Sequence, residues 1–277
     1  MRKRPWSKWG ILISLAGGFM LAGCSQSREN ESSELLLAAA ASLKNVYEDE
    51  LIPMFQQTYP QIKVRGTYDS SGKLQAQIEG GLEADLFMSA ARTQMEALDQ
   101  QGLIDSQSIT DLLENKIVLI VPEGNDQGFQ EFADIQLADS IALGDPESVP
   151  AGEYAREALT SLGLWDSIQD KISFGTNVTE VLNQVAAASA DAGIVYATDA
   201  ASMEDQVDVV AEAPEGSLEN PVIYPAAVVK TTAHPQEAQT FLEFLKTPQA
   251  MEVFEAYGFA DASKKAAGER MRTAPVQ

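Results

Sequence analysis

A short polar stretch, "DSSGK" at residues 69–73, carries side chains that could do chemistry in two different ways. Read as Ser70-Ser71-Gly72-Lys73, it matches S-x-x-K, an acyl-transfer motif in which a lysine accompanies a serine nucleophile. The same residues are also typical of a helix start, where a hydroxyl and free backbone N–H groups can hold an anion. The chain therefore either attacks a substrate with a serine or binds an anion with one.

The other parts of a catalytic apparatus are missing from the sequence. No S-D-N or G-x-S-x-G occurs, and Lys230-Thr231-Thr232 only partly matches K-T-G. His234 is the only histidine, and its place in "TTAHPQ" is typical of a loop before a helix. No His/Cys cluster with metal-ligand spacing is present. The sequence therefore predicts that the protein is not an enzyme, has no cofactor and has no metal site, with Ser70/Lys73 acyl transfer as a remote alternative.

Three further predicted helix starts share the small, hydroxylic character of "DSSGK". They are "AAAS" (39–42), which ends in Ser42, "GDPESVPAG" (144–152) and "GTNVTE" (175–180). Each follows a predicted strand, and the carboxyl ends of strands are where α/β sheets bind ligands. If the four starts converge, their N–H groups and dipoles make an anion site. Each start alone is most often a structural cap worth about 1 kcal/mol.

The elements that must position these residues alternate between strand and helix. Predicted strands lie at 35–40, 62–68, 85–90, 116–122, 140–145, 171–175, 192–197, 207–213 and 222–230. Predicted helices lie at 43–59, 72–79, 93–101, 151–162, 178–188, 238–245 and 248–257, with Pro53 as a kink or break in the first. The pattern predicts an α/β protein with mostly parallel, doubly wound sheets. A division near Pro122 favours two lobes.

The N-terminal segment 1–23 has the layout of a secretory signal, with four basic residues followed by a short apolar run. It ends in Leu-Ala-Gly before Cys24, the only cysteine, which resembles a bacterial lipobox and implies a lipid on Cys24. Residues 24–33 are expected to be a polar tether. The sequence predicts an exported, lipid-anchored protein on the extracytoplasmic face or in the periplasm. Its net charge of −22 argues against nucleic-acid binding, and against an anion site built from clustered Lys and Arg.

Several motifs, in order, resemble the periplasmic molybdate-binding protein family, the substrate-binding components of molybdate ABC importers. They are "AAASL", "SSGKLQAQIEGGLEADLFMSA", "GDPESVPAGEYAREAL", "GIVYATDA", "YPAAVV" and "YGF". The resemblance runs from Leu35 to Phe259, and "GDPESVPAG" is its most specific part.

This resemblance implies a two-lobed, class II periplasmic-binding fold that closes on a tetrahedral oxyanion. It places the ligand contacts on two serine hydroxyls, two backbone N–H groups and a tyrosine hydroxyl: Ser42, Ser71, Ala151, Val178 and Tyr196. Ser70 is the nearest rival to Ser71 if the register shifts. Without the resemblance, a structural role is the favoured explanation for each of these residues. Asp69 and Lys73 add charges beside the pocket, and the sequence does not say whether they face it.

The expected ligand is molybdate, with tungstate of nearly equal size. A fully ionised oxyanion offers only acceptors, which suits a pocket of O–H and N–H donors. Phosphate retains a proton that would face other donors, whereas sulfate could be rejected only by size. A protein of the same fold that binds sulfate or another small solute is the alternative function.

The resemblance also implies the membrane permease of an ABC importer as the partner, and we expect a monomer. The predicted domains are a signal peptide (1–23), a tether (24–33), a first lobe (34–118 and 225–277) and a second lobe (119–224). The hinges are expected near 117–122 and 221–227.

Overall fold

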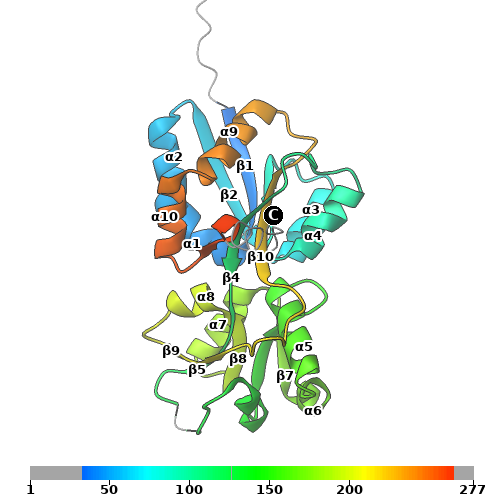
Figure 1. Cartoon of the computed structure of the whole chain (residues 1–277), viewed down its shortest axis with the longest axis vertical. Helices are drawn as coiled ribbons and strands as arrows, with labels where there is room; N and C mark the ends of the chain where they lie inside the picture. Colours follow the sequence, from blue (N-terminus) through cyan, green and yellow to red (C-terminus); the bar gives the residue numbers. More distant parts are fainter. Residues whose placement is uncertain (1–32, 126, 265–277) are drawn as a thin grey trace, which may run out of the picture. The chain divides into compact units, whose positions relative to one another are not determined.

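The computed structural model describes residues 33–125 and 127–264, which form two β-sheets flanked by helices (Figure 1). The predicted signal segment, Cys24 and all of the predicted tether except Ser33 lie outside these residues. Ser33 is the first residue of the first strand.

The first lobe is built on a six-stranded sheet of order β11-β4-β10-β3-β1-β2. Strands β1 and β2 pair in parallel, as do β1 and β3, whereas β10 runs antiparallel to both β3 and β4. The strands are β1 (Ser33–Ala40), β2 (Ile62–Asp69), β3 (Leu86–Met88), β4 (Thr110–Asn115), β10 (Val222–Val228) and β11 (Ala260–Asp261).

The second lobe is built on a five-stranded sheet of order β7-β6-β8-β5-β9. Strand β6 pairs in parallel with β7 and β8, and β5 runs antiparallel to β8 and β9. The strands are β5 (Ile117–Pro122), β6 (Ile141–Gly144), β7 (Ile172–Gly175), β8 (Ala192–Tyr196) and β9 (Val207–Glu212).

Helices pack on both lobes, and in Figure 1 α2 and α10 lie on one side of the first lobe with α3 and α4 on the other. The helices of the first lobe are α1 (Lys44–Val46), α2 (Ile52–Thr58), α3 (Ser71–Glu79), α4 (Arg92–Gln100), α9 (Pro235–Leu245) and α10 (Pro248–Ala256), with a 3₁₀ turn at Ala41–Leu43. Those of the second lobe are α5 (Pro150–Ser161), α6 (Trp165–Ile168), α7 (Val178–Ala186) and α8 (Ala197–Ala201), with 3₁₀ turns at Phe132–Leu137 and Gln169–Lys171.

The chain passes between the sheets twice, and this explains why both are mixed. Only Lys116 separates β4 from β5, and residues 213–221 join β9 to β10. A strand that enters from the other sheet runs against its neighbours, so the antiparallel pairs involve β4, β5, β9 and β10. The predicted fold class is confirmed, with more antiparallel pairing than the sequence pattern indicates. The segments expected as hinges, 117–122 and 221–227, lie mostly in strands β5 and β10 just after each crossing.

Strand β1 shows why the first predicted strand is a continuous apolar run. Leu35, Leu37 and Ala39 face one hydrophobic cluster, and Leu36 and Ala38 face a second one under α3 and α4. Because both faces of the strand are covered, no polar alternation is needed.

The predicted helix 43–59 contains a wide turn that the sequence reading missed. A π-helical segment at Tyr47–Leu51 precedes α2, and Pro53 lies in the first turn of α2. Because helical turns precede it, Pro53 leaves a carbonyl of the preceding turn without an N–H partner, and the wide turn just before it makes room for the proline ring, so the helical run continues through it. Strands β4 and β11 were also not predicted, since "TDLLEN" is largely polar and β11 has only two residues.

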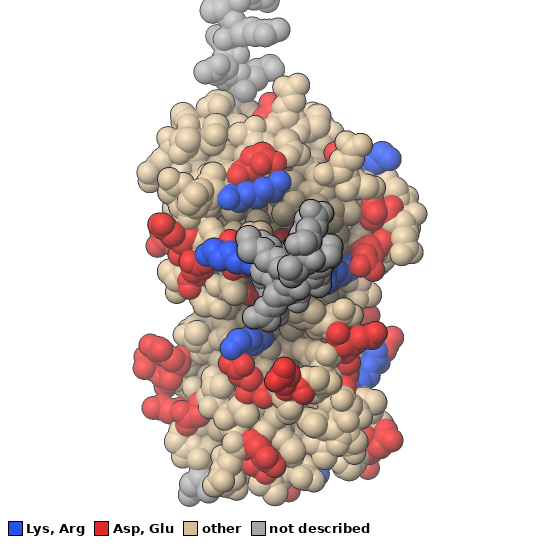
Figure 2. All heavy atoms as spheres, viewed as in Figure 1, with Lys and Arg blue, Asp and Glu red and all other residues tan. Residues whose placement is uncertain are grey.

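Acidic residues are distributed over both lobes on the face shown in Figure 2, with fewer basic residues among them. Within the described part of the chain, no helix has the length and apolar character needed to cross a membrane.

The core of the first lobe contains an aromatic cluster around Phe241, which is fully buried. Its ring lies 4.8 Å from that of Phe55 in an edge-on arrangement and 6.3 Å from that of Tyr47. We expect Phe241→Ala to lower the free energy of unfolding by about 3–5 kcal/mol, because it removes these contacts and leaves a cavity. Urea denaturation measures this change. Phe174→Ala is the control, since Phe174 is 48% exposed and its loss should cost under about 1 kcal/mol.

Candidate functional site

The structure brings all five predicted site residues to one small cavity between the lobes. Ser42 and Ser71 come from the first lobe, and the other three come from the second. The residues around it are Ala40, Ala41, Ser42, Asp69, Ser70, Ser71, Ala90, Val149, Pro150, Ala151, Val178 and Tyr196.

Three helices begin at this cavity. Ser71 is the first residue of α3, Ala151 is the second of α5, and Val178 is the first of α7. The first backbone N–H groups of a helix have no partner within it and carry the positive end of its dipole. The side chain of Asn177 caps α7 by accepting from the Glu180 N–H at 2.9 Å. Three of the four predicted starts therefore converge as α-helices, and the fourth, at Ser42, lies at the cavity as the 3₁₀ turn Ala41–Leu43.

The hydroxyl of Ser71 is oriented by a hydrogen bond from the backbone. Its Oγ accepts from the Ala90 N–H at 3.0 Å, and the residue is fully buried. The oxygen already serves as an acceptor, so the proton is available for donation to another group. Ser71 can thus supply a hydrogen-bond donor at the cavity.

Tyr196 reaches the cavity from the end of β8. Its hydroxyl donates to the Ala90 carbonyl at 3.4 Å, a long bond that a better acceptor could replace. Burial raises the pKa of Tyr196 well above its usual value, so the hydroxyl keeps its proton at neutral pH. It is therefore a second neutral donor from a side chain.

Ser70 has a different role from Ser71 in the geometry. Its side chain caps α3 by accepting from the Lys73 N–H at 3.4 Å, and it also lines the cavity. The Lys73 ammonium lies 3.3 Å from an Asp69 carboxylate oxygen. Lys73 is thus paired with Asp69, an arrangement that does not favour its use as the base for a Ser70 nucleophile.

Asp69 is the one charged residue among the described residues that line the cavity. Its Oδ1 accepts from the Ser70 N–H at 2.8 Å, from Lys73 and, across the lobes, from Asn177 Nδ2 at 3.4 Å. Lys73 is not among the lining residues. These donors offset the carboxylate charge, so an anion in the cavity meets less repulsion than Asp69 alone would produce.

Two other contacts join the lobes beside the cavity. The Gly72 N–H donates to the Ser148 carbonyl at 3.0 Å, and a Cβ on Gly72 would lie only 2.5 Å from that oxygen. Gln94 on α4 donates to Glu153 on α5. Burial raises the pKa of Glu153, and the bond from Gln94 opposes this rise.

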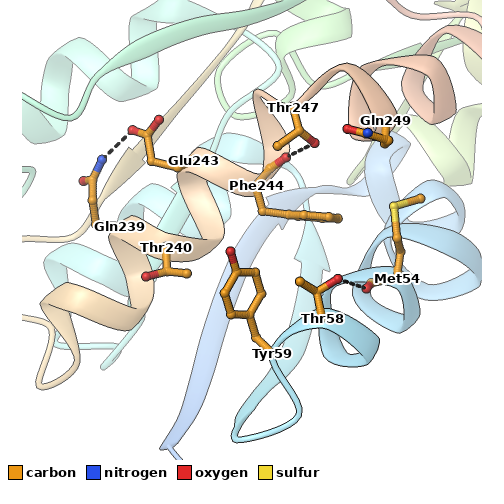
Figure 3. A pocket seen from close by; sticks show the side chains of 9 residues that line it. All are labelled: Met54, Thr58, Tyr59, Gln239, Thr240, Glu243, Phe244, Thr247 and Gln249. Carbon is orange, nitrogen blue, oxygen red and sulfur yellow. Dashed lines mark hydrogen bonds between the residues drawn. The ribbon is translucent and has the colours of Figure 1, made fainter.

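A larger, open hollow lies on the first lobe between the end of α2 and the helices α9 and α10 (Figure 3). Three of its side chains already donate to neighbouring oxygens: Thr58 to the Met54 carbonyl, Thr247 to the Phe244 carbonyl, and the Gln239 amide to Glu243. Glu243 adds a negative charge. This hollow therefore does not have the donor set that an anion requires.

Sequence reasoning missed a polar group of residues beside the cavity. Tyr224 on β10 and Asn115 at the end of β4 are buried, and Asp199 on α8 is buried with them. Ser42 Oγ lies 3.0 Å from the Tyr224 hydroxyl. The quoted "YPAAVV" and "GIVYATDA" contain Tyr224 and Asp199, but nothing in these motifs marked either residue as part of a site, and Asn115 lies in no quoted motif.

A two-lobed α/β fold with a cavity at its helix starts defines a solute-binding protein of the periplasmic type. The chain belongs to the bacterial extracellular solute-binding protein family, which matches residues 35–260. It is therefore a solute-binding protein and not an enzyme, as the sequence predicts.

Similar proteins support the resemblance seen in the motifs. The chain is 41% identical to YvgL of Bacillus subtilis strain 168, named as a candidate substrate-binding lipoprotein of an ABC transporter, over 92% of this chain and 98% of that one. It is 35% identical to the molybdate-binding protein ModA of Escherichia coli K12, over 91% and 98%. The structure of the periplasmic molybdate-binding protein of Azotobacter vinelandii matches with a TM-score of 0.70 and 27% identity, over 82% and 98%.

Asp199 makes stability depend on pH. Its Oδ2 is buried without a hydrogen-bond partner among the described residues, and burial raises its pKa to about 7, opposed by a bond from the Tyr196 N–H. A raised pKa means that the folded state binds the proton more tightly than the unfolded state. The protonated carboxyl therefore stabilises the fold below about pH 4, and this contribution is lost as the pH rises to about 7.

We expect Asp199→Asn to remove the loss of stability that the unmodified protein shows as the pH rises toward 7. The difference in the free energy of unfolding, variant minus unmodified protein, should rise by on the order of 1 kcal/mol per pH unit between about pH 4 and 7. Urea denaturation at several pH values measures the difference. Asp191→Asn is the control: bonds from Ser140 lower the pKa of Asp191, so its contribution changes only below about pH 4 and its difference should be flat between about pH 4 and 7. A pH-independent difference for Asp199→Asn would contradict the expectation.

Proposed function

We propose that this protein is the extracytoplasmic solute-binding component of an ABC importer, and that its cavity binds molybdate, with tungstate as a second ligand. One observation carries the proposal. Hydroxyls and the starts of α3, α5 and α7 meet at one cavity, and none of its described lining residues is Lys or Arg.

The donor set suits an oxyanion without protons. Ser42, Ser71 and Tyr196 supply hydroxyls, and Ala151 and Val178 supply N–H groups, so each oxygen of a dianion can accept. Hydrogen bonds to an ionised group are about twice as strong as those between neutral groups. Protonated phosphate would present a donor to other donors, and sulfate is smaller, so its exclusion would depend on the size of the cavity. Relatives named as molybdate-binding proteins favour molybdate over sulfate.

The remaining parts of the proposal concern the cell surface. A lipid on Cys24 would hold the protein at the extracytoplasmic face of the membrane, as the name of the lipoprotein relative supports. The partner would be the membrane permease of the importer, which receives the oxyanion when the lobes open. We propose that the protein acts as a monomer, with a signal peptide over 1–23 and a tether that ends before β1 at Ser33. The lobes divide at Lys116 and within residues 213–221, a few residues before the boundaries that the sequence predicts.

Calorimetric titration of the purified protein with molybdate, tungstate, sulfate and phosphate tests the ligand. We expect binding of the first two and no detectable binding of the others.

Ser71→Ala and Tyr196→Phe should each weaken molybdate binding about 10- to 100-fold, because each removes a charge-assisted hydrogen bond. Ser70→Ala is the matched control, expected mainly to cost about 1 kcal/mol of stability as a lost cap. Sulfate binding equal to that of molybdate would assign the cavity to another solute.

Gly72 tests whether the contact between the lobes serves ligand binding. An added Cβ would clash with the Ser148 backbone of the second lobe and with nothing closer in its own lobe. We expect Gly72→Ala to weaken molybdate binding at least about tenfold while changing the free energy of unfolding by less than about 1 kcal/mol. Gly80→Ala, at the far end of α3, should leave both unchanged. If Gly72→Ala and Gly80→Ala change the affinity for molybdate equally, ligand binding does not require the close contact between Gly72 and the Ser148 backbone.

A further inference from the structure

A chain of buried hydrogen bonds links the cavity to the point where the polypeptide crosses between the lobes. It runs from Asn115, the last residue of β4, through Tyr224 on β10 to Ser42. Asn115 and Tyr224 are 5% and 0% exposed, and neither lines the cavity. Of its three members only Ser42 lines the cavity, so Ser42 is where the chain can act on a ligand.

The orientation of the Asn115 amide is fixed by its neighbour. The Lys116 backbone N–H, which can only donate, lies 2.8 Å from Oδ1. The NH₂ group of Asn115 therefore faces the other way, toward the Tyr224 hydroxyl at 3.2 Å and the Thr198 hydroxyl at 2.9 Å. The amide is thus a donor to Tyr224.

The direction of the next bond follows from this one. The Tyr224 hydroxyl accepts from Asn115, and its only other described partner is Ser42 Oγ, at 3.0 Å. If Ser42 donated to Tyr224, the proton of a fully buried hydroxyl would have no acceptor, which is unfavourable. Burial, with the Asp199 carboxylate nearby, raises the pKa of Tyr224 well above its usual value, so the proton is retained. Tyr224 therefore donates to Ser42.

We propose that Tyr224, aligned by Asn115, is a positioning residue that turns the Ser42 hydroxyl toward the cavity as a hydrogen-bond donor. This inference rests on the proposed function and deepens it. Ser42 Oγ is occupied as an acceptor, so its own proton is directed at an oxyanion. A freely rotating serine hydroxyl could bind either a donor or an acceptor. The Ser42 hydroxyl, held by Tyr224, can only donate toward the cavity. The pocket is thereby specific for acceptor-only ligands.

A double-mutant cycle separates this role from a packing role. Tyr224→Phe removes one oxygen and retains the ring, which lies 5.4 Å from each of the rings of Tyr196 and Phe259. The affinity for molybdate is measured in the unmodified protein, in Tyr224→Phe, in Ser42→Ala and in the double variant. If Tyr224 acts through Ser42, its loss should weaken binding about tenfold with Ser42 present and less than about twofold without it.

Tyr47→Phe is the matched control for the loss of a buried hydroxyl. Tyr47 is fully buried in the same lobe, and its hydroxyl donates to Met88 Sδ, away from the cavity. This variant should bind molybdate with unchanged affinity. Urea denaturation of all variants shows whether each is folded under the titration conditions.

Asn115→Asp gives a second test that does not depend on Tyr224→Phe. An aspartate at 115 accepts from Tyr224 instead of donating to it, so Ser42 loses the donor that orients it. Molybdate binding should weaken more with Ser42 present than in the Ser42→Ala background. An equal loss in both backgrounds would indicate repulsion by the new charge.

The outcomes distinguish the two proposals. If the unmodified protein does not bind molybdate, the proposed function is wrong and the inference falls with it. If it binds, but Tyr224→Phe has no effect or an equal effect in both Ser42 backgrounds, the inference alone is overturned. The inference is supported if Tyr224→Phe weakens molybdate binding much more with Ser42 present than in the Ser42→Ala background, while Tyr47→Phe leaves the affinity unchanged.

Discussion

The structure depends on bringing unpaired helix N–H groups from two separate sheets to one point. A helix start leaves its first N–H groups without partners, and a buried cavity that collects several such starts is costly unless an acceptor enters. The sheets make this arrangement possible, because their parallel strands all end at the edges that face each other. Helices α3, α5 and α7 each follow such a strand directly. The order of strands and helices therefore creates the cavity and its N–H groups, and the side chains add hydroxyl donors to it.

Charge is managed differently at the cavity and on the surface. The chain carries a net charge of −22, and its acidic groups lie on both lobes. At the cavity the single lining carboxylate is held by Lys73, the Ser70 N–H and Asn177, so its charge is spread over three donors. Buried tyrosines with raised pKa remain neutral. Neutral dipoles can hold an anion firmly where water is excluded, because the local dielectric constant is low.

Much of the candidate site could be predicted from the sequence, because its residues belong to recognisable helix starts. Ser42, Ser71 and Ala151 follow apolar strands and precede periodic helices, and the fold brings these starts together. Tyr224 and Asn115 could not be found this way, since their importance comes from side-chain contacts between strands far apart in the chain. The antiparallel pairs were missed for a similar reason. Strand direction depends on where the chain crosses between sheets, and the crossing at Lys116 leaves no loop to mark it.

That crossing also limits how the two lobes can move. Asn115 belongs to one sheet and Ile117 to the other, with Lys116 alone between them. Two peptide units span at most about 7 Å, so the ends of β4 and β5 cannot separate further, whatever the rest of the molecule does. The second crossing, 213–221, has more length to extend. The connection at Lys116 is therefore a fixed pivot, and the connection 213–221 is a longer segment that can extend. The lobes can thus rearrange only by rotating about Lys116.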